Sequence, residues 1–176
     1  GRYREFALRF LPEKVRYLLV GESPPLTPPD EELRYFYNYK NVNGGQMLLS
    51  SVSYSFLNQK FYVGKYNKEQ FLRRLSNHGV FLIDAVYEPI NQIKDKELRR
   101  SKIEDRYGKL KKNMRGLRLE DSAKILIIHG NVIEAIGQKL RDDFQSQGYT
   151  FYDVGFPSYY NDEKFKAKIV RAIEDG

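Results

Sequence analysis

The sequence contains no cysteine and no tryptophan, and its only histidines are His78 and His129. Without cysteine the chain cannot form disulfides, thiolate zinc sites or cysteine-ligated iron–sulfur clusters, and it has no cysteine nucleophile. Two histidines are too few for a multi-histidine metal site. We therefore expect a protein that uses no metal and no cofactor.

Long apolar runs are absent as well. No stretch approaches the roughly 20 apolar residues that a membrane-spanning helix needs, and residues 1–5 have no signal-peptide pattern. We expect an intracellular protein, cytoplasmic or associated with the nucleoid, with no membrane partner. The 176 residues, 41% hydrophobic and 30% charged, are typical of one globular domain over residues 1–176. We expect it to be a monomer.

Positive charge is in excess, because 30 Lys and Arg against 23 Asp and Glu give a net charge of +7. A basic domain of this size suggests a polyanionic partner, of which nucleic acid is the commonest. The alternative is a generally basic soluble protein. The 14 tyrosines suit base stacking beside phosphate contacts, although many will belong to the core. We expect DNA, single- or double-stranded, as the partner.

Short apolar runs alternate with segments of helical periodicity along the chain. The runs predict buried strands at residues 15–20, 79–86, 123–130 and 149–154. The periodic segments predict helices at residues 2–11, 46–57, 68–77, 94–118, 132–147 and from 162 onward. This alternation favours a parallel sheet between helices. The predicted fold class is α/β: a three-layer α/β/α sandwich with a central, mainly parallel four-stranded sheet.

Three local features are less regular. Asp30 offers an N-cap for a short helix that begins at Glu31, and Asn131 offers one for the helix at 132–147. Residues 61–66 suggest a short extended piece. The charged segment 94–118 reads as one long amphipathic helix, broken near Gly108, whose Lys and Arg either contact phosphates or form a solvated face.

Polar residues follow each predicted strand. They are Glu22 and Ser23 after the first, Asp84 at the end of the second, His129 and Asn131 after the third, and Pro157 and Ser158 after the fourth. In a parallel sheet these carboxyl ends share one edge, where open α/β sheets bind ligands. Plainer readings exist: a proline-stiffened turn around Glu22, an N-cap or solvated strand end for Asp84, and a structural role for His129.

An aromatic segment follows the first strand. Residues 34–40 carry four aromatic rings between two cations, which is unusual for a connector. Two of the rings fit a core role. We expect Tyr37 and Tyr39 to reach the same sheet edge and wall a pocket there.

Four motifs, in this order, resemble the uracil-DNA glycosylase superfamily, closest to thermophilic branches whose first motif reads G-E-A-P-G or G-E-A-P-A. G-E-S-P-P at 21–25 is similar to that first motif, and residues 39–49, with G-G-Q-M-L-L, resemble the segment that follows it. F-L-I-D-A-V at 81–86 lies where those enzymes have a strand ending in Thr-Asn, and G-F-P-S at 155–158 resembles the final His-Pro-Ser motif. The resemblance covers residues 15 to about 166.

The resemblance implies a three-layer α/β/α fold that flips a base into a pocket at this edge. By analogy Tyr39 or Tyr37 would stack on the base, and Asp84 and Asn131 would bind it. Glu22 and Ser23, with Asp84, would position water against the sugar C1′. The DNA contacts would come from Pro24, Pro25, Pro157, Ser158 and Tyr159, the last as a wedge in the duplex.

The chain departs from the family at two positions. Asp84 replaces the base-reading Asn, and an ionised carboxylate cannot donate a hydrogen bond to a uracil carbonyl. Phe156 replaces the His of the last motif, for which His129 is a candidate substitute. Either the chemistry is altered, or the fold is a DNA-binding module without catalysis. A hydrolase of small nucleosides or nucleotides is a third reading.

Overall fold

The computed structural model describes residues 1–42, 46–158 and 160–175. Its sheet has four strands: β1 (Val15–Gly21), β2 (Val80–Asp84), β3 (Leu119–Ile127) and β4 (Thr150–Asp153). Their order is β2-β1-β3-β4, and all three neighbouring pairs are parallel. The predicted α/β sandwich is confirmed. Leu18, Leu19 and Val20 of β1 are fully buried, as the apolar run requires.

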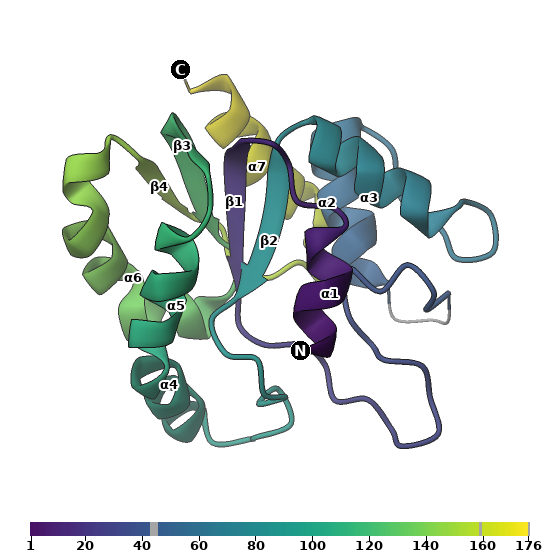
Figure 1. The fold of residues 1–176 in the computed structure, drawn as a ribbon, viewed down its shortest axis with the longest axis horizontal. Helices are drawn as coiled ribbons and strands as arrows, with labels where there is room; N and C mark the ends of the chain where they lie inside the picture. The colour runs from purple at the N-terminus through teal and green to yellow at the C-terminus, as the bar shows by residue number, and fades with distance from the viewer. Residues whose placement is uncertain (43–45, 159, 176) are drawn as a thin grey trace.

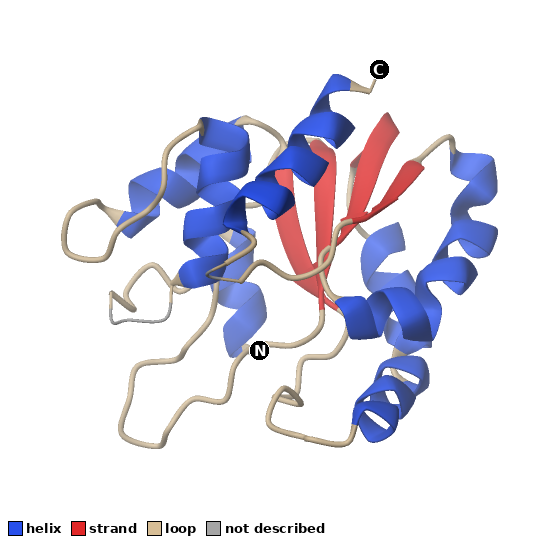
Figure 2. Cartoon of the chain, turned by 180° about the vertical axis from the view of Figure 1, so that it is seen from behind, coloured by secondary structure: helices blue, strands red, loops and turns tan. Residues whose placement is uncertain are grey.

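Helices cover both faces of the sheet. They are α1 (Arg2–Leu8), α2 (Met47–Leu57), α3 (Lys68–Asn77), α4 (Lys96–Asp105), α5 (Tyr107–Arg115), α6 (Gly130–Phe144) and α7 (Asp162–Glu174), and a 3₁₀ turn follows α6 at Gln145–Gln147. Helices α2 and α7 pack together over one face, which Figure 2 shows from behind. Helix α5 crosses the other face (Figure 1), and α6 packs along β3 and β4. In the described part of the chain, no helix has the length and apolar character required to cross a membrane.

The carboxyl ends of β1 and β2 point toward the lower edge of the molecule in Figure 1, where two long loops lie: residues 22–42 and residues 85–95. The chain leaves β1 for β2 on one side and later crosses back to β3 on the other. The gap between β1 and β3 is therefore the topological switch point, where sheets of this kind bind ligands.

Several local predictions are wrong. Asp30 caps no helix. Residues 22–42 form loop and turns, and four of these residues are prolines, which disfavour regular structure. Residues 61–66 form turns instead of an extended piece. The break that was predicted near Gly108 in the segment 94–118 is confirmed, because α4 and α5 are separated at Arg106. The third strand starts at Leu119, four residues before its predicted start, and its first pairing with β1 is separated from the rest by a register shift.

Candidate functional site

The loop after β1 is organised by a buried asparagine. Asn38 is fully buried, and its amide donates to the carbonyl of Leu33 at 2.7 Å and to the carboxylate of Glu32 at 3.1 Å. Its oxygen accepts from the backbone of Lys40 at 3.1 Å. From α3, the buried Lys68 ammonium donates to the carbonyl of Tyr35 at 3.2 Å. These contacts replace the missing helix as the source of order in the loop.

This loop, α2 and β2 enclose a pocket of about 290 Å³ at the carboxyl edge of the sheet. Residues from the loop, from the start of α2 and from β2 line it: Ser23, Pro24, Pro25, Arg34, Tyr35, Phe36, Asn41, Gln46, Leu48, Leu49, Leu82 and Asp84. Leu82 and Asp84 are two apart on one strand, so both point to the same face. The wall is mainly apolar and aromatic, and Asp84 is its only acidic group among the described residues.

Asp84 is the buried carboxyl group of the pocket. The residue is 6% exposed, and no described residue donates a hydrogen bond to its carboxyl oxygens. Burial first, and then the neighbouring negative charge of Glu22, raise the pKa of Asp84 to about 7. A Cβ on Gly21 would lie 2.7 Å from the Asp84 Oδ1, so the glycine of β1 gives this carboxyl its space.

Glu22 is one residue beyond Gly21, the register partner of Asp84, and lies outside the pocket lining. Both of its oxygens are bound by the guanidinium of Arg99 from α4, through Nε at 3.2 Å and through the short Nη2 contact. The amide of Asn131 donates to Glu22 Oε2 at 2.9 Å. Asn131 was predicted to bind the base, yet its side chain is buried and committed to Glu22. This geometry favours Asp84 over Glu22 as the group that meets a ligand.

His129 is the N-cap of α6, where Asn131 was predicted to be. Its Nδ1 accepts the backbone N–H of Asn131 at 3.2 Å, so the proton of the neutral ring is assigned to Nε2. Burial lowers the pKa of His129, although the charge of Glu22 opposes the effect. The imidazole is therefore neutral at neutral pH, so its contact with Glu22, 3.7 Å from Nδ1 to Oε2, is not an ion pair. His129 also contacts the ring of Phe156, with centroids 5.5 Å apart.

The prediction that Tyr37 stacks on a base is wrong. Tyr37 is 3% exposed, and its ring stacks with Phe10 and Phe81 in the core. Its hydroxyl accepts the backbone N–H of Leu82 at 2.7 Å, which satisfies a donor on the outer strand of the sheet. Burial of this hydroxyl raises the pKa of Tyr37.

Tyr39 does not line the pocket either. Arg9 lies over its ring at 4.5 Å, and the rings of Phe6 and Phe10 meet it edge-on. The other two rings of the aromatic segment, those of Tyr35 and Phe36, line the pocket instead. The sequence identified the segment correctly but assigned the roles within it to the wrong members.

The predicted DNA-contacting residues divide into two groups. Pro24 and Pro25 line the pocket beside Ser23, whose hydroxyl accepts the backbone N–H of Ile90 at 3.4 Å. Pro157 is buried, Ser158 is half-buried, and Tyr159 lies outside the described residues. The neighbouring start of α7 carries Asp162 and Glu163 in its first turn, which disfavours a phosphate there.

Arg99 is the site residue that the sequence did not indicate. It lies 77 residues from Glu22 along the chain, within a segment of many cations, and no local pattern distinguishes it. Among the described residues, no three carboxylate or imidazole groups gather as a metal site would require. No protein-family model matches the chain, and no curated protein or solved structure is significantly similar to it.

Proposed function

We propose that this chain is a DNA base-excision glycosylase, which takes a damaged or deaminated base into the pocket beside Asp84 and hydrolyses its N-glycosidic bond. The observation that supports this best is a buried acid with no described hydrogen-bond donor, facing a small pocket walled by aromatic residues. A pocket of about 290 Å³ is at the lower end of the range of ~300–1,000 Å³ for ligand sites, which suits a single base.

The lining of the pocket matches what a flipped base requires. A base that leaves the duplex loses stacking and pairing, a loss of a few kcal/mol that a site must offset. Phe36 is half-buried and offers ring surface for stacking, while Leu48, Leu49 and Leu82 exclude water. Asp84 supplies the polar group that fixes the orientation of the base edge.

The chemistry needs one proton donor near the departing base. As the bond between C1′ and the base nitrogen breaks, the Asp84 acid gives its proton to the base, and the sugar becomes an oxocarbenium-like ion. A water molecule then adds its oxygen to C1′ and returns a proton to the Asp84 carboxylate. The products are the free base and an abasic sugar, and the acid is regenerated. A carboxyl whose pKa is about 7 is suited to this transfer at neutral pH.

The charge of the chain supports a DNA substrate. Arg34 lies at the pocket lining and is exposed, paired only with the exposed Glu31 at 2.7 Å among its described contacts. Such a surface pair contributes little stability, so it can exchange for a phosphate contact. The net charge of +7 favours association with a polyanion. We place the activity inside the cell, in the cytoplasm or at the nucleoid, where this substrate is found.

A cleavage screen tests the proposal. Labelled single- and double-stranded oligonucleotides that carry uracil, hypoxanthine, xanthine or a mismatch are incubated with the protein and treated with alkali to reveal abasic sites. We expect cleavage on at least one substrate, and its loss in Asp84→Ala. The matched control is Asp121→Ala, which removes an exposed carboxylate near the amino end of β3 and should leave cleavage unchanged.

One observation favours a second candidate, a DNA-binding module without catalysis. Glu22 is held on both oxygens by Arg99 and Asn131, and Phe156 stands where the family has a His. Under this alternative no substrate is cleaved, but the oligonucleotides are retained in a gel shift with an affinity that falls as salt rises. Cleavage of free nucleosides without cleavage of DNA would instead indicate a small-molecule hydrolase.

A further inference from the structure

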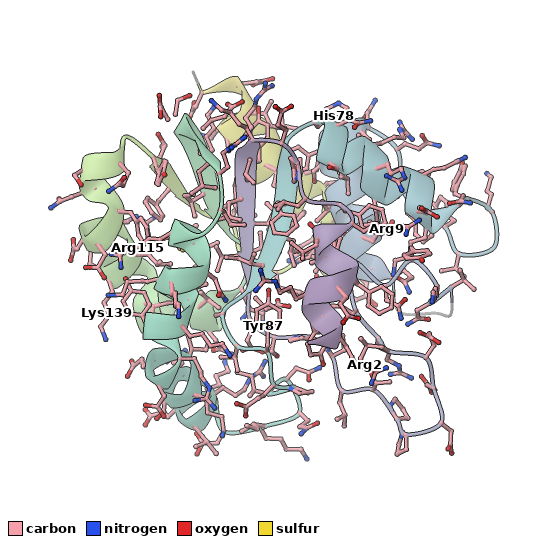
Figure 3. All side chains as sticks on the ribbon, in the orientation of Figure 1. Arg2, Arg9, His78, Tyr87, Arg115 and Lys139 are labelled. Carbon is pink, nitrogen blue, oxygen red and sulfur yellow. The ribbon has the colours of Figure 1, made fainter. Side chains whose placement is uncertain are left out.

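One lysine is buried where a positive charge is unfavourable. Lys68 is 2% exposed, and it is the first residue of α3, at the opposite end of that helix from His78, which Figure 3 labels. The amino end of a helix carries partial positive charge, so a cation is disfavoured there. Burial without a counter-ion is a second penalty, and no carboxylate of the described residues forms an ion pair with Lys68. A neutral side chain at this position would avoid both penalties.

The contact that Lys68 makes is with the wall of the pocket. Its ammonium donates to the carbonyl of Tyr35 at 3.2 Å, and the same carbonyl accepts the backbone N–H of Asn38 at 3.0 Å. Tyr35 is buried and lines the pocket, whereas Lys68 does not line it. Any effect of Lys68 on a ligand therefore passes through Tyr35.

This hydrogen bond also ties the loop to the rest of the fold. Residues 22–42 form no helix or strand, so individual contacts order their backbone. Many of these contacts are internal, such as the one from the amide of Asn38 to the carbonyl of Leu33. In the described part of the chain, Lys68 is the only residue of a helix or strand that hydrogen-bonds the backbone of residues 24–40. A hydrogen bond from a charged donor is stronger than one between neutral groups.

The carbonyl that Lys68 binds belongs to the peptide between Tyr35 and Phe36, and both of these residues line the pocket. A peptide unit is planar, so the direction of its carbonyl determines how the chain enters Phe36. The ring of Tyr35 is held separately, through edge-on contacts with the rings of Tyr3 and Tyr37 at centroid distances of 4.9 and 5.9 Å. Lys68 thus fixes the backbone from which the two lining rings project.

We propose that Lys68 is a positioning residue that holds the peptide between Tyr35 and Phe36, and with it the aromatic wall of the pocket, at a cost to the stability of the fold. Without the ammonium this peptide is freer to rotate, and a ligand would have to order the wall as it binds, which weakens affinity. The consequence for a base rests on the proposed function, but the effect of Lys68 on the loop does not.

Hydrogen exchange of the full chain, followed by NMR at pH 6, tests the role of Lys68 without a substrate. In Lys68→Met we expect the backbone amides of Asn38 and Lys40 to exchange about tenfold faster, because the loop opens more readily once it loses a hydrogen bond from a charged donor. Buried amides of β1, such as that of Leu19, exchange through global unfolding. They should exchange more slowly in the variant, because it no longer buries a charge.

The matched control is Lys168→Met on α7. The Lys168 ammonium also donates to a backbone carbonyl, that of Val154, at 3.2 Å, and its loss should leave the exchange of residues 22–42 unchanged. Loop and strand amides that exchange faster together in Lys68→Met, or a Lys68→Met protein that does not fold, would overturn the proposal, since Lys68 would then be an ordinary stabilising contact. Unchanged exchange in the loop would overturn it as well.

An activity measurement tests the consequence for the pocket. On an oligonucleotide that the wild type cleaves, Lys68→Met should lower kcat/KM by about tenfold, mainly through a higher KM, while Lys168→Met should leave both constants unchanged. Wild-type kinetics in Lys68→Met would show that the wall needs no positioning and would overturn this part of the proposal. If no oligonucleotide is cleaved, the proposed function fails, and the exchange measurement still decides whether Lys68 holds the loop.

Discussion

Replacing Asp84 by Asn should stabilise the protein, and by an amount that depends on pH. Burial and Glu22 raise the pKa of Asp84 from 3.8 to about 7. Below about pH 4 the carboxyl is protonated in the folded and unfolded states alike, and it imposes no electrostatic penalty. Between pH 4 and 7 only the folded state holds the proton, so the free energy of unfolding falls as pH rises. Above pH 7 the full penalty is present.

The size of this penalty follows from the same two values. One pKa unit corresponds to about 1.4 kcal/mol, so the shift amounts to about 4 kcal/mol at pH 8. Asn is close to Asp in shape and does not titrate. We therefore expect Asp84→Asn to unfold with nearly the wild-type free energy at pH 4, and with up to about 4 kcal/mol more at pH 8.

Urea unfolding of both proteins at pH 4, 6 and 8 measures the difference. The other titrating groups are common to the two proteins, so their contributions cancel. Asp121→Asn, at an exposed carboxylate, is the control and should show no gap that grows with pH. A gap between Asp84→Asn and wild type that is equal at pH 4 and pH 8 would refute the reasoning, since it would mean that Asp84 titrates normally.

Three further predictions concern the core and the pocket mouth. Tyr37→Phe should lower the free energy of unfolding by about 1–3 kcal/mol in urea melts, because the N–H of Leu82 loses its acceptor; no loss would mean that the hydroxyl is dispensable. Arg34→Gln should weaken oligonucleotide binding and reduce the slope of log affinity against log salt by about one. Lys139→Gln, on α6 and far from the loop at residues 22–42 (Figure 3), should do neither, and equal effects of the two variants would remove Arg34 from the interface. Burial lowers the pKa of Lys68 to about 8. Between pH 8 and 10.5 the unfolded state therefore binds more protons than the folded state, and the free energy of unfolding of the wild type should rise with pH. Lys68→Met should unfold with about 1–3 kcal/mol more free energy than the wild type at pH 7, and this difference should disappear by pH 10.

The sheet was predictable because its strands are coded locally. Each strand contains a short apolar run, although β3 begins four residues before its run. The spacing between runs leaves room only for helical crossovers, which require parallel pairing. Helix α3 matched its prediction at both ends, because Asn67 caps it through a bond that depends on neighbouring residues alone. Local signals of this kind do not depend on the tertiary fold.

The loop and the site were less predictable because they depend on contacts between distant residues. Asp30 has the right chemistry for an N-cap, but the loop takes its order from Asn38 and from Lys68, which comes from another element. Tyr37 and Phe36 are adjacent and equally aromatic, and only the packing against Phe81 decides which of them is enclosed. A composition signal can thus locate a segment without telling which side chain faces the pocket.

The arrangement of Arg99, Glu22 and Asp84 relates the stability of the fold to its proposed chemistry. A fold selected for stability alone would gain from a neutral side chain at position 84, since the buried carboxyl carries a penalty of about 4 kcal/mol at pH 8. The Arg99 guanidinium and the Asn131 amide donate to Glu22, which does not line the pocket. Neither donates to Asp84, which does line it. Binding Asp84 in the same way would relieve the penalty but would also fix it as a carboxylate. The uneven distribution of donors therefore favours a site in which the proton on Asp84 has a use.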